Sequence, residues 1–322
     1  MIPDPPWLSV IIVTWNGKAY VEECLHSLQT QEMPYSTEII VVDNASSDGT
    51  PEMIQARFPA VRLVRNAENL GFGKANNIGI RLSRGKQICL INSDVNVHVT
   101  CLATMSRYLE QHPKVGLIGP RMIGPDGLAS RSCMRFPTLR AYLCYSLGLD
   151  LATNEMPPFS GILMRNCTWD RTAEVDVLNG WFVMTRREAL DEVGLLDERF
   201  FMYGEDIDWS YRFYRAGWKR IYLAGAQAIH YGGASSARSP IRFYLEMVRA
   251  NLQFWKKWNG RWKTIAFAFA VGLHEVVRSI VYGLQVVFSK TCRPDALFKL
   301  RRCVACLRWL VTNRGSAMVS SS

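Results

Sequence analysis

One stretch of the sequence carries three carboxylates within four residues, at Glu205, Asp206 and Asp208. They follow an aromatic segment that ends in glycine, residues 200–204, and they open a helical pattern that runs to Gly217, a suitable C-terminal cap. Acidic side chains in a first helical turn interact favourably with the positive end of the helix dipole, which is the structural interpretation. A carboxylate placed after a glycine and against aromatic walls is also suited to act as a general base.

The spacing of these three carboxylates separates their roles. Asp208 precedes Arg212 by four residues, the separation that pairs opposite charges on one helix face, so we expect a structural ion pair. Glu205 and Asp206 stand at the start of the helix and remain candidates for chemistry. The elements that surround them are needed to choose between the two interpretations.

Charge is unevenly distributed along the 322 residues. Residues 241–322 contain 14 Lys and Arg against 3 Asp and Glu, whereas the first 240 residues contain 24 and 25. The net charge of +10 therefore comes from the C-terminal region, which follows a nearly neutral domain. A basic region attracts nucleic acid or an anionic membrane surface, and its other residues must distinguish the two.

The cysteines and the N-terminus bear on the compartment. The nine cysteines are scattered through apolar patterns. We expect most of them to be small buried hydrophobic residues in a protein of a reducing compartment. Cys303 and Cys306 form a single C-x-x-C with no second pair, which does not favour a zinc or redox site. No basic and apolar leader precedes the first strand, so we expect the domain to face the cytoplasm.

The first 95 residues alternate between strand and helix patterns. Helical patterns at residues 17–31 and 69–83, and a turn followed by a helix start at 44–51, separate the strands. This alternation predicts an α/β sandwich built on a mostly parallel sheet. The expected strands are apolar, β-branched runs at residues 8–13, 38–43, 61–64 and 87–92.

Polar residues follow three of these strands, at 14–16, 43–44 and 92–94. Ligands of open α/β sheets bind at the carboxyl ends of the strands, so we expect these clusters to converge on one rim. The glycine fingerprint of a dinucleotide site is missing after the first strand, and no P-loop is present.

A second half follows with a different pattern. We expect a strand at 115–120, a continuous strand at 175–185 leading to a helix at 186–193, and closing strands within 221–230. Residues 128–170 have no clear period and are rich in arginine and aromatic residues. They suit either a surface that shapes an acceptor site or a plain long loop.

Together these pieces resemble a family 2 glycosyltransferase of the GT-A fold, a Rossmann-like α/β fold. The matching stretches, in the family's order, are residues 9–16, 39–50, 69–79, 90–95, 178–187, 194–218 and 230–235. Within the family the chain is most similar to bacterial rhamnosyltransferase-type enzymes that build cell-surface polysaccharides. The resemblance implies a catalytic domain at 1–238, with a nucleotide-sugar half at about 1–120 and an acceptor half at about 121–238, followed by a basic amphipathic helical region at 239–322.

The resemblance implies that the enzyme binds a nucleoside-diphosphate sugar. Asp43 matches the carboxylate that contacts the nucleoside. The other residues in matching nucleotide-sugar stretches are Thr14, Asn16, Asn69, Gly71, Lys74, Asn92 and Asp94.

The resemblance also implies a divalent metal, Mg²⁺ or Mn²⁺, on the diphosphate. Asp94 matches the last acid of the family's D-x-D-type motif, which reads Asn92-Ser93-Asp94 here and so has one carboxylate instead of two. We expect Asp94 and the diphosphate oxygens to hold the metal together with His230, since few protein ligands suffice for a hard cation on phosphate. A strand-end histidine without a metal is the alternative for His230.

Asp206 matches the family's catalytic base, which would take the proton of the acceptor hydroxyl as its oxygen attacks the anomeric carbon. A single displacement of this kind inverts the anomeric centre. We expect Glu205 to orient the base or the acceptor, and Gly180, Trp181 and Trp209 to border the acceptor and sugar, with either indole stacking on a sugar face or serving only as a core aromatic.

The C-terminal region is expected to bind a membrane surface through residues 241–322. Tryptophans and cations interleave at 254–263, as they do at a headgroup interface, and residues 299–314 are basic and amphipathic. An apolar run at 265–288 is interrupted by His274, Glu275 and Arg278, which share a helix face with Gln285. We therefore favour a helix in the interface or packed on a partner over one that spans the bilayer. Long apolar faces do not favour nucleic acid.

The leading interpretation is an inverting glycosyltransferase, peripheral on the inner face of the cell membrane. It would move a sugar, with rhamnose favoured, to a glycan or lipid-linked acceptor. A nucleotidyltransferase lacks support because the segment after the first strand is not a phosphate loop. A non-catalytic glycan-binding or scaffold protein on a degenerate transferase fold remains open. The nucleotide (dTDP, UDP or GDP), the acceptor, the linkage and the oligomeric state are also open.

Overall fold

The computed structural model describes residues 4–232, 239–289, 291 and 293–312, and it divides into two compact units. The first unit contains residues 1–134 and 168–238, and the second contains 135–167 and 239–322. The sequence analysis had placed the segment 135–167 with the first region. It belongs to the second unit because its helix α5 (Leu139–Leu147) packs on helix α9 (Pro240–Phe288), with the ring of Tyr142 4.7 Å from that of Phe267.

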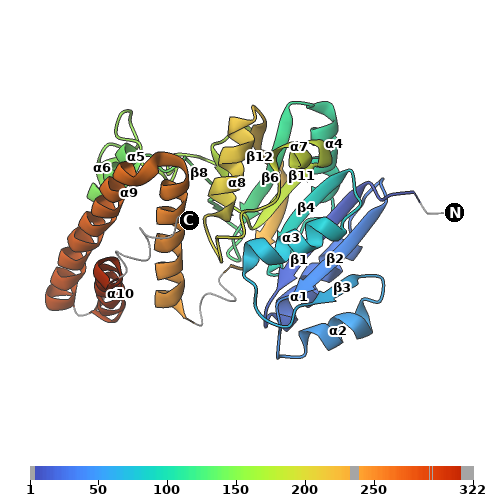
Figure 1. Ribbon diagram of the computed structural model, residues 1–322, viewed down its shortest axis with the longest axis horizontal. Coiled ribbons are helices and arrows are strands. Elements are labelled where there is room, and N and C mark those ends of the chain that lie inside the picture. Colours follow the sequence, from blue (N-terminus) through green and yellow to red (C-terminus); the bar gives the residue numbers. More distant parts are fainter. Residues whose placement is uncertain (1–3, 233–238, 290, 292, 313–322) are drawn as a thin grey trace. The chain divides into compact units, whose positions relative to one another are not determined.

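The first unit is a mixed sheet with helices on it (Figure 1), which confirms the predicted α/β class. The sheet order is β3-β2-β1-β4-β11-β6-β12-β5, with β7 beside β6 and β9 beside β12. Its strands are β1 (Leu8–Thr14), β2 (Thr37–Asp43), β3 (Arg62–Arg65), β4 (Gln87–Asn92), β5 (Val95–Val97), β6 (Val115–Ile123), β7 (Ala129–Ser130), β9 (Ala173–Glu174), β11 (Phe182–Arg186) and β12 (Lys219–His230). A separate two-stranded ladder joins β8 (Cys133–Met134) to β10 (Val177–Leu178).

The strands β3, β2, β1 and β4 are parallel, as the sequence predicted, whereas β11 runs antiparallel to both of its neighbours. Thr14 pairs with Asp43, and Val13 pairs with Asn92. The carboxyl ends of β1, β2 and β4 therefore meet at one rim. This register confirms that the three polar clusters converge.

The expected strand at 175–185 is interrupted. β10 ends at Leu178 and β11 begins at Phe182, so residues 179–181 leave the ladder between them. The prediction of one continuous strand was wrong because the segment is apolar throughout, and its pattern does not mark the point at which the backbone leaves the sheet.

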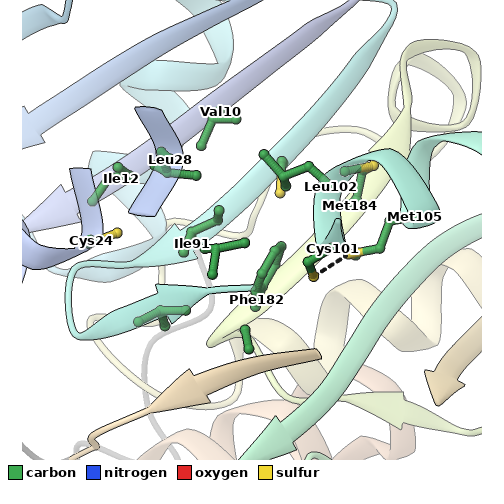
Figure 2. Close-up of a cluster of buried hydrophobic side chains, with 14 of the residues drawn as sticks. Val10, Ile12, Cys24, Leu28, Ile91, Cys101, Leu102, Met105, Phe182 and Met184 are labelled. Carbon is green, nitrogen blue, oxygen red and sulfur yellow. Dashed lines mark hydrogen bonds between the residues drawn. The ribbon is translucent and has the colours of Figure 1, made fainter. Parts of the chain in front are cut away.

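The described part of the first unit contains six helices beside its sheet. The core lies between β1, β4 and β11 and the helices α1 and α4 (Figure 2), where Val10, Leu28, Leu102 and Phe182 are buried. The six helices are α1 (Lys18–Gln29), α2 (Thr50–Arg57), α3 (Phe72–Leu82), α4 (Cys101–Gln111), α7 (Arg187–Val193) and α8 (Glu205–Arg215).

The second unit is helical. It contains α5 (Leu139–Leu147), α6 (Leu149–Ala152), α9 (Pro240–Phe288) and α10 (Arg293–Thr312). Gly260 leaves the helical conformation with φ 75° and divides α9 into a first arm, residues 240–259, and a second arm, residues 261–288 (Figure 1). The rings of Trp255 and Phe267, one from each arm, stack at 4.5 Å. The segment 128–170 is thus not a plain loop, since α5 and α6 lie within it.

By length and composition, α9 is the one helix in the described part of the chain that is long and apolar enough to cross a membrane. Residues 233–235 of the last family-matching stretch and residues 313–314 of the basic stretch lie outside the described residues. Of the eight described cysteines, all are free thiols and seven are buried, as expected.

Candidate active site

The acidic stretch forms the first turn of α8. Gly204 precedes the helix with φ 79°, a left-handed conformation that glycine adopts without strain. Asp208 is fully buried, and its Oδ2 accepts a hydrogen bond from Nε of Arg212 at 2.9 Å. This pair confirms that Asp208 is structural. Glu205 and Asp206 remain for the site.

Asp206 is half-buried and held by backbone amides. Its Oδ2 accepts a hydrogen bond from the Gly180 amide at 3.0 Å, and its Oδ1 accepts one from the Ile207 amide at 2.8 Å. A side chain at Gly180 would place its Cβ 3.3 Å from Cβ of Asp206, so glycine permits this close approach. Burial raises the pKa of Asp206, while the backbone amide donors oppose that rise. A carboxylate with a raised pKa is a better proton acceptor than a free aspartate.

Glu205 points away from the rim. It is 5% exposed and, with Asp206, lines a cavity of about 10 Å³ whose other walls are largely apolar, including Leu178, Leu196 and Trp209. Its Oε2 has no hydrogen-bond partner among the described residues. Burial and, to a smaller extent, the neighbouring Asp206 raise the pKa of Glu205 well above its usual range. The expectation that Glu205 orients the acceptor is therefore corrected, because its carboxyl faces the interior.

The segment 179–181 connects Asp206 to a second pair of side chains. Its Trp181 ring stacks on the His230 ring at 5.2 Å, and Nε2 of His230 lies 3.2 Å from Oδ1 of Asp94. The Trp181 carbonyl also accepts a hydrogen bond from the Asn92 amide at 2.8 Å. The three residues that interrupt the predicted strand thus touch both the candidate base and the Asp94–His230 pair.

The Asp94–His230 pair forms a hydrogen bond, and the same separation of its atoms is compatible with a shared divalent cation. Two adjacent ligands of an octahedral ion at about 2.1–2.2 Å lie roughly 3.0 Å apart, close to the separation of this carboxylate oxygen and imidazole nitrogen. No cluster of three or more His, Cys, Asp and Glu side chains suited to a metal occurs in the described parts of the chain. A metal held by this pair would need further oxygen ligands from diphosphate and water.

Two of the residues expected at the nucleotide lie at the ends of β1 and β2 with unsatisfied polar atoms. Thr14 and Asp43 are each 1% exposed, and Thr14 Oγ1 and Asp43 Oδ1 have no hydrogen-bond partner among the described residues. The other oxygen of Asp43 accepts from the Ser46 amide. Asn16 instead holds the adjacent loop, because its Oδ1 accepts from the Ser47 amide at 2.7 Å.

The residues at the start of α3 have packing roles of their own. Asn69 Oδ1 accepts from the Gly71 amide at 3.0 Å. A Cβ on Gly71 would lie 2.3 Å from the Phe201 carbonyl oxygen, and φ there is +82°, so contact with the acidic stretch explains this glycine without a ligand. Lys74 is exposed, one helical turn into α3.

The two tryptophans offer no open face for a sugar. Trp209 is 2% exposed, and its Nε1 donates to the Gly194 carbonyl at 3.0 Å. Trp181 is 5% exposed and stacks on His230. The prediction of sugar stacking is corrected for both, because Trp209 lies on the inner face of α8 and Trp181 packs in the core cluster.

Two positioning residues escaped the sequence analysis. Asn77 is fully buried on α3 and exchanges hydrogen bonds with the Leu196 amide and carbonyl, which fastens the segment before α8 to the sheet layer. Tyr231 follows His230, and its amide donates to the Asp94 carbonyl while its hydroxyl donates to Glu23 on α1. No residue pattern signals either contact, since each joins segments more than 100 residues apart.

The chain is similar in sequence to several known proteins. The family model described as "Glycosyl transferase family 2" matches residues 9–194. The N-acetylglucosaminyl-diphospho-decaprenol L-rhamnosyltransferase of Mycobacterium tuberculosis is 30% identical over 292 residues, which cover 84% of this chain and 93% of that protein. The low-salt glycan biosynthesis hexosyltransferase Agl10 of Haloferax volcanii is 22% identical, over 90% and 94% of the two chains.

Solved structures agree on the fold. The mannosyltransferase PcManGT of Pyrobaculum calidifontis, in complex with GDP-Man and Mn²⁺, has a TM-score of 0.54 at 17% identity and covers 97% of this chain and 89% of its own. TarS of S. aureus in complex with UDP has a TM-score of 0.51 at 15% identity, over 98% and 93%. The fold is thus the one found in glycosyltransferases.

The chain belongs to glycosyl transferase family 2. It is a glycosyltransferase that uses a nucleotide sugar, as the ordered stretches of the sequence predicted.

Proposed function

We propose that this enzyme transfers a rhamnosyl group, with inversion, from a nucleoside-diphosphate donor to a lipid-diphosphate-linked glycan at the cytoplasmic face of the cell membrane. The sugar and the acceptor are taken from the mycobacterial relative, whose name specifies L-rhamnose transfer to an N-acetylglucosaminyl-diphospho-decaprenol. The catalytic roles are assigned from the contacts of Asp206 and of the Asp94–His230 pair described above.

One observation carries the mechanism: the segment 179–181 contacts both Asp206 and the Asp94–His230 pair. In our proposal the acceptor hydroxyl oxygen forms a bond to the anomeric carbon while Asp206 takes its proton. The bond from that carbon to the diphosphate oxygen breaks, and the diphosphate leaves with the electron pair. Asp206 must be ionised to take this proton.

Thr14 and Asp43 would hold the nucleoside. Their buried, unpaired oxygens at the ends of β1 and β2 are suited to accept hydrogen bonds from a base or ribose. Asp94 and His230 would hold a divalent metal, which offsets the charge on the leaving diphosphate. Glu205 would orient Asp206, because both side chains line the same small cavity.

A thermal-shift screen tests the donor site. The purified chain is melted with dTDP, UDP, GDP and their sugars, with Mn²⁺ or Mg²⁺, and again with a chelator. We expect one nucleotide to raise the melting temperature in a metal-dependent way, because a ligand of the native state stabilises it by mass action. No shift with any nucleotide would contradict the proposal.

A transfer assay then tests the reaction. With the matching nucleotide-linked rhamnose and an N-acetylglucosaminyl-diphospho-polyprenol, we expect a product whose new linkage has the opposite anomeric configuration to the donor, read by NMR. Retention of configuration would contradict a single displacement. Transfer only to a soluble glycan would contradict the lipid-linked acceptor.

A further inference from the structure

The second arm of α9 presents a continuous apolar face to its surroundings. We define the apolar stripe as the exposed side chains Phe269, Leu273, Val276, Ile280, Leu284 and Val287. Their spacing of three or four residues keeps them on one side of the helix over about 27 Å. Phe269 is 74% exposed and Val287 65% exposed, so the described residues of the second unit do not cover the stripe. An exposed apolar patch of this length marks a binding surface.

The opposite face of the same arm is buried and contains ionisable as well as apolar side chains. Glu275 is fully buried, and its Oε1 accepts a hydrogen bond from the Tyr244 hydroxyl of the first arm. His274 is 5% exposed, and its ring stacks on that of Tyr145 in α5 at 5.3 Å. Phe267 and Val271 are also buried on this face, so the arm places apolar side chains both in the interior and along the exposed stripe, whereas a helix on a water-soluble protein has a polar outer face.

Charge indicates what covers the stripe. At its N-terminal end, the kink at Gly260 is followed by Arg261, Trp262 and Lys263, all exposed. From residue 256 to residue 289 the sequence has one acid, the buried Glu275. Cations with tryptophan beside an apolar stripe fit an anionic lipid headgroup layer over acyl chains, and they do not complement a second copy of the same basic face.

The unit is not suited to cross the bilayer. Because α10 packs on α9, a span by the second arm would bring α10 into the bilayer as well, and α10 carries five cations within 20 residues. Three of them, Arg293, Arg301 and Arg308, are exposed. Exposed arginines are costly in the hydrocarbon layer, so a position in the plane of the interface is favoured.

We propose that the second arm of α9 lies in the plane of an anionic bilayer, with the apolar stripe among the acyl chains and Arg261, Trp262 and Lys263 at the headgroups. This inference makes the membrane placement of the proposed function specific. Membrane docking by α9 does not depend on sugar transfer, so disproving either proposal does not disprove the other.

Vesicle flotation of the full chain tests the docking. Vesicles contain phosphatidylethanolamine and phosphatidylglycerol, or phosphatidylcholine alone. We expect wild type to float with the anionic vesicles and the triple variant Phe269→Ser, Ile280→Ser, Leu284→Ser to bind them at least tenfold more weakly. The matched control, Leu128→Ser with Met156→Ser, replaces two side chains that are each 67% exposed elsewhere and should bind as wild type does.

The double variant Arg261→Gln, Lys263→Gln should lose most of the preference for anionic over neutral vesicles. Wild type that stays unbound, or a triple variant that floats like wild type, would overturn the proposal. So would a lipid-free dimer, measured by light scattering, that the triple variant converts to a monomer, because the stripe would then be covered by a second copy.

Depth of insertion distinguishes lying from spanning, independently of the triple variant. In Leu273→Trp, the added fluorescence should be quenched more by lipids brominated near the headgroup than by lipids brominated at mid-chain. Stronger quenching at mid-chain would indicate a span and overturn the in-plane position. Helical content by circular dichroism and the denaturant unfolding midpoint serve as the folding controls for every variant.

Discussion

The two units place their polar groups in opposite ways. In the first, an apolar sheet core supports a rim where buried polar atoms such as Asp43 Oδ1 lack partners among the described residues. In the second, Glu275 and His274 lie inside a helical assembly whose outer face is apolar. Unsatisfied groups at a strand-end rim are suited to a polar ligand, whereas an apolar exterior is suited to lipid.

This difference separates what each unit requires of its surroundings. The rim of the first unit is completed by a small polar molecule, so changes there should alter chemistry and leave the fold intact. The second unit holds Glu275 and His274 inside its own helical assembly, each with one polar atom that has no hydrogen-bond partner among the described residues, so changes there should alter stability and leave donor binding intact. Four predictions test this separation, beginning with the largest effect.

Asp206→Asn should abolish most activity. The amide cannot take a proton, so we expect kcat to fall by about 10²- to 10⁴-fold while the donor still raises the melting temperature. Steady-state kinetics and the thermal shift measure the two parts. Turnover near the wild-type rate would remove Asp206 from the role of base and would favour another residue of the rim.

Asp94→Asn should weaken catalysis by about 10²- to 10³-fold through loss of charge compensation at the diphosphate. It should also remove the metal dependence of the nucleotide thermal shift, and a chelator should have the same effect on wild type. His230→Ala is the companion variant. An unchanged response to Mn²⁺ in both variants would show that the metal, if used, is held elsewhere.

Glu275→Ala should destabilise the second unit by about 1–3 kcal/mol, because the Tyr244 hydroxyl loses its buried acceptor. Denaturant unfolding measures the loss. Glu275→Gln is the matched control, since its amide oxygen can still accept that hydrogen bond. Equal stability of the alanine variant and wild type, or a lost nucleotide thermal shift, would break the separation between the units.

Glu205→Gln should have the smallest effect, within about threefold in kcat, because glutamine is a neutral group of similar shape and burial raises the pKa of the carboxyl that it replaces. The acidic limb of the pH–rate profile reports Asp206. Since burial raises the pKa of Asp206, activity should fall with decreasing pH above the usual aspartate pKa of about 3.9. A limb that moves to lower pH in Glu205→Gln would mean that Glu205 is ionised and repels Asp206.

The parallel strands β1 to β4 and their common rim could be predicted from the sequence, because apolar β-branched runs and the polar residues after them are local patterns. The ion pair between Asp208 and Arg212 was predictable for the same reason, since both charges lie on one helix. The family followed from six stretches in a fixed order, together with a seventh that extends beyond the described residues.

Side-chain direction was decided only by tertiary structure. Glu205 and Asp206 are adjacent in sequence and line the same small cavity, yet Asp206 accepts a hydrogen bond from the Gly180 amide whereas Glu205 Oε2 has no partner among the described residues, because the packing of α8 sets which way each points. The burial of Trp181 and Trp209, and the break at 179–181, likewise depend on strands and helices far away in the chain. In the second unit, the sequence by itself determined that His274 and Glu275 share a helix face. Only the tertiary structure, in which α9 turns at Gly260 and α5 and α10 pack on it, decided that this face is the interior. The physical reason is that contacts between distant segments determine which side of a helix is covered.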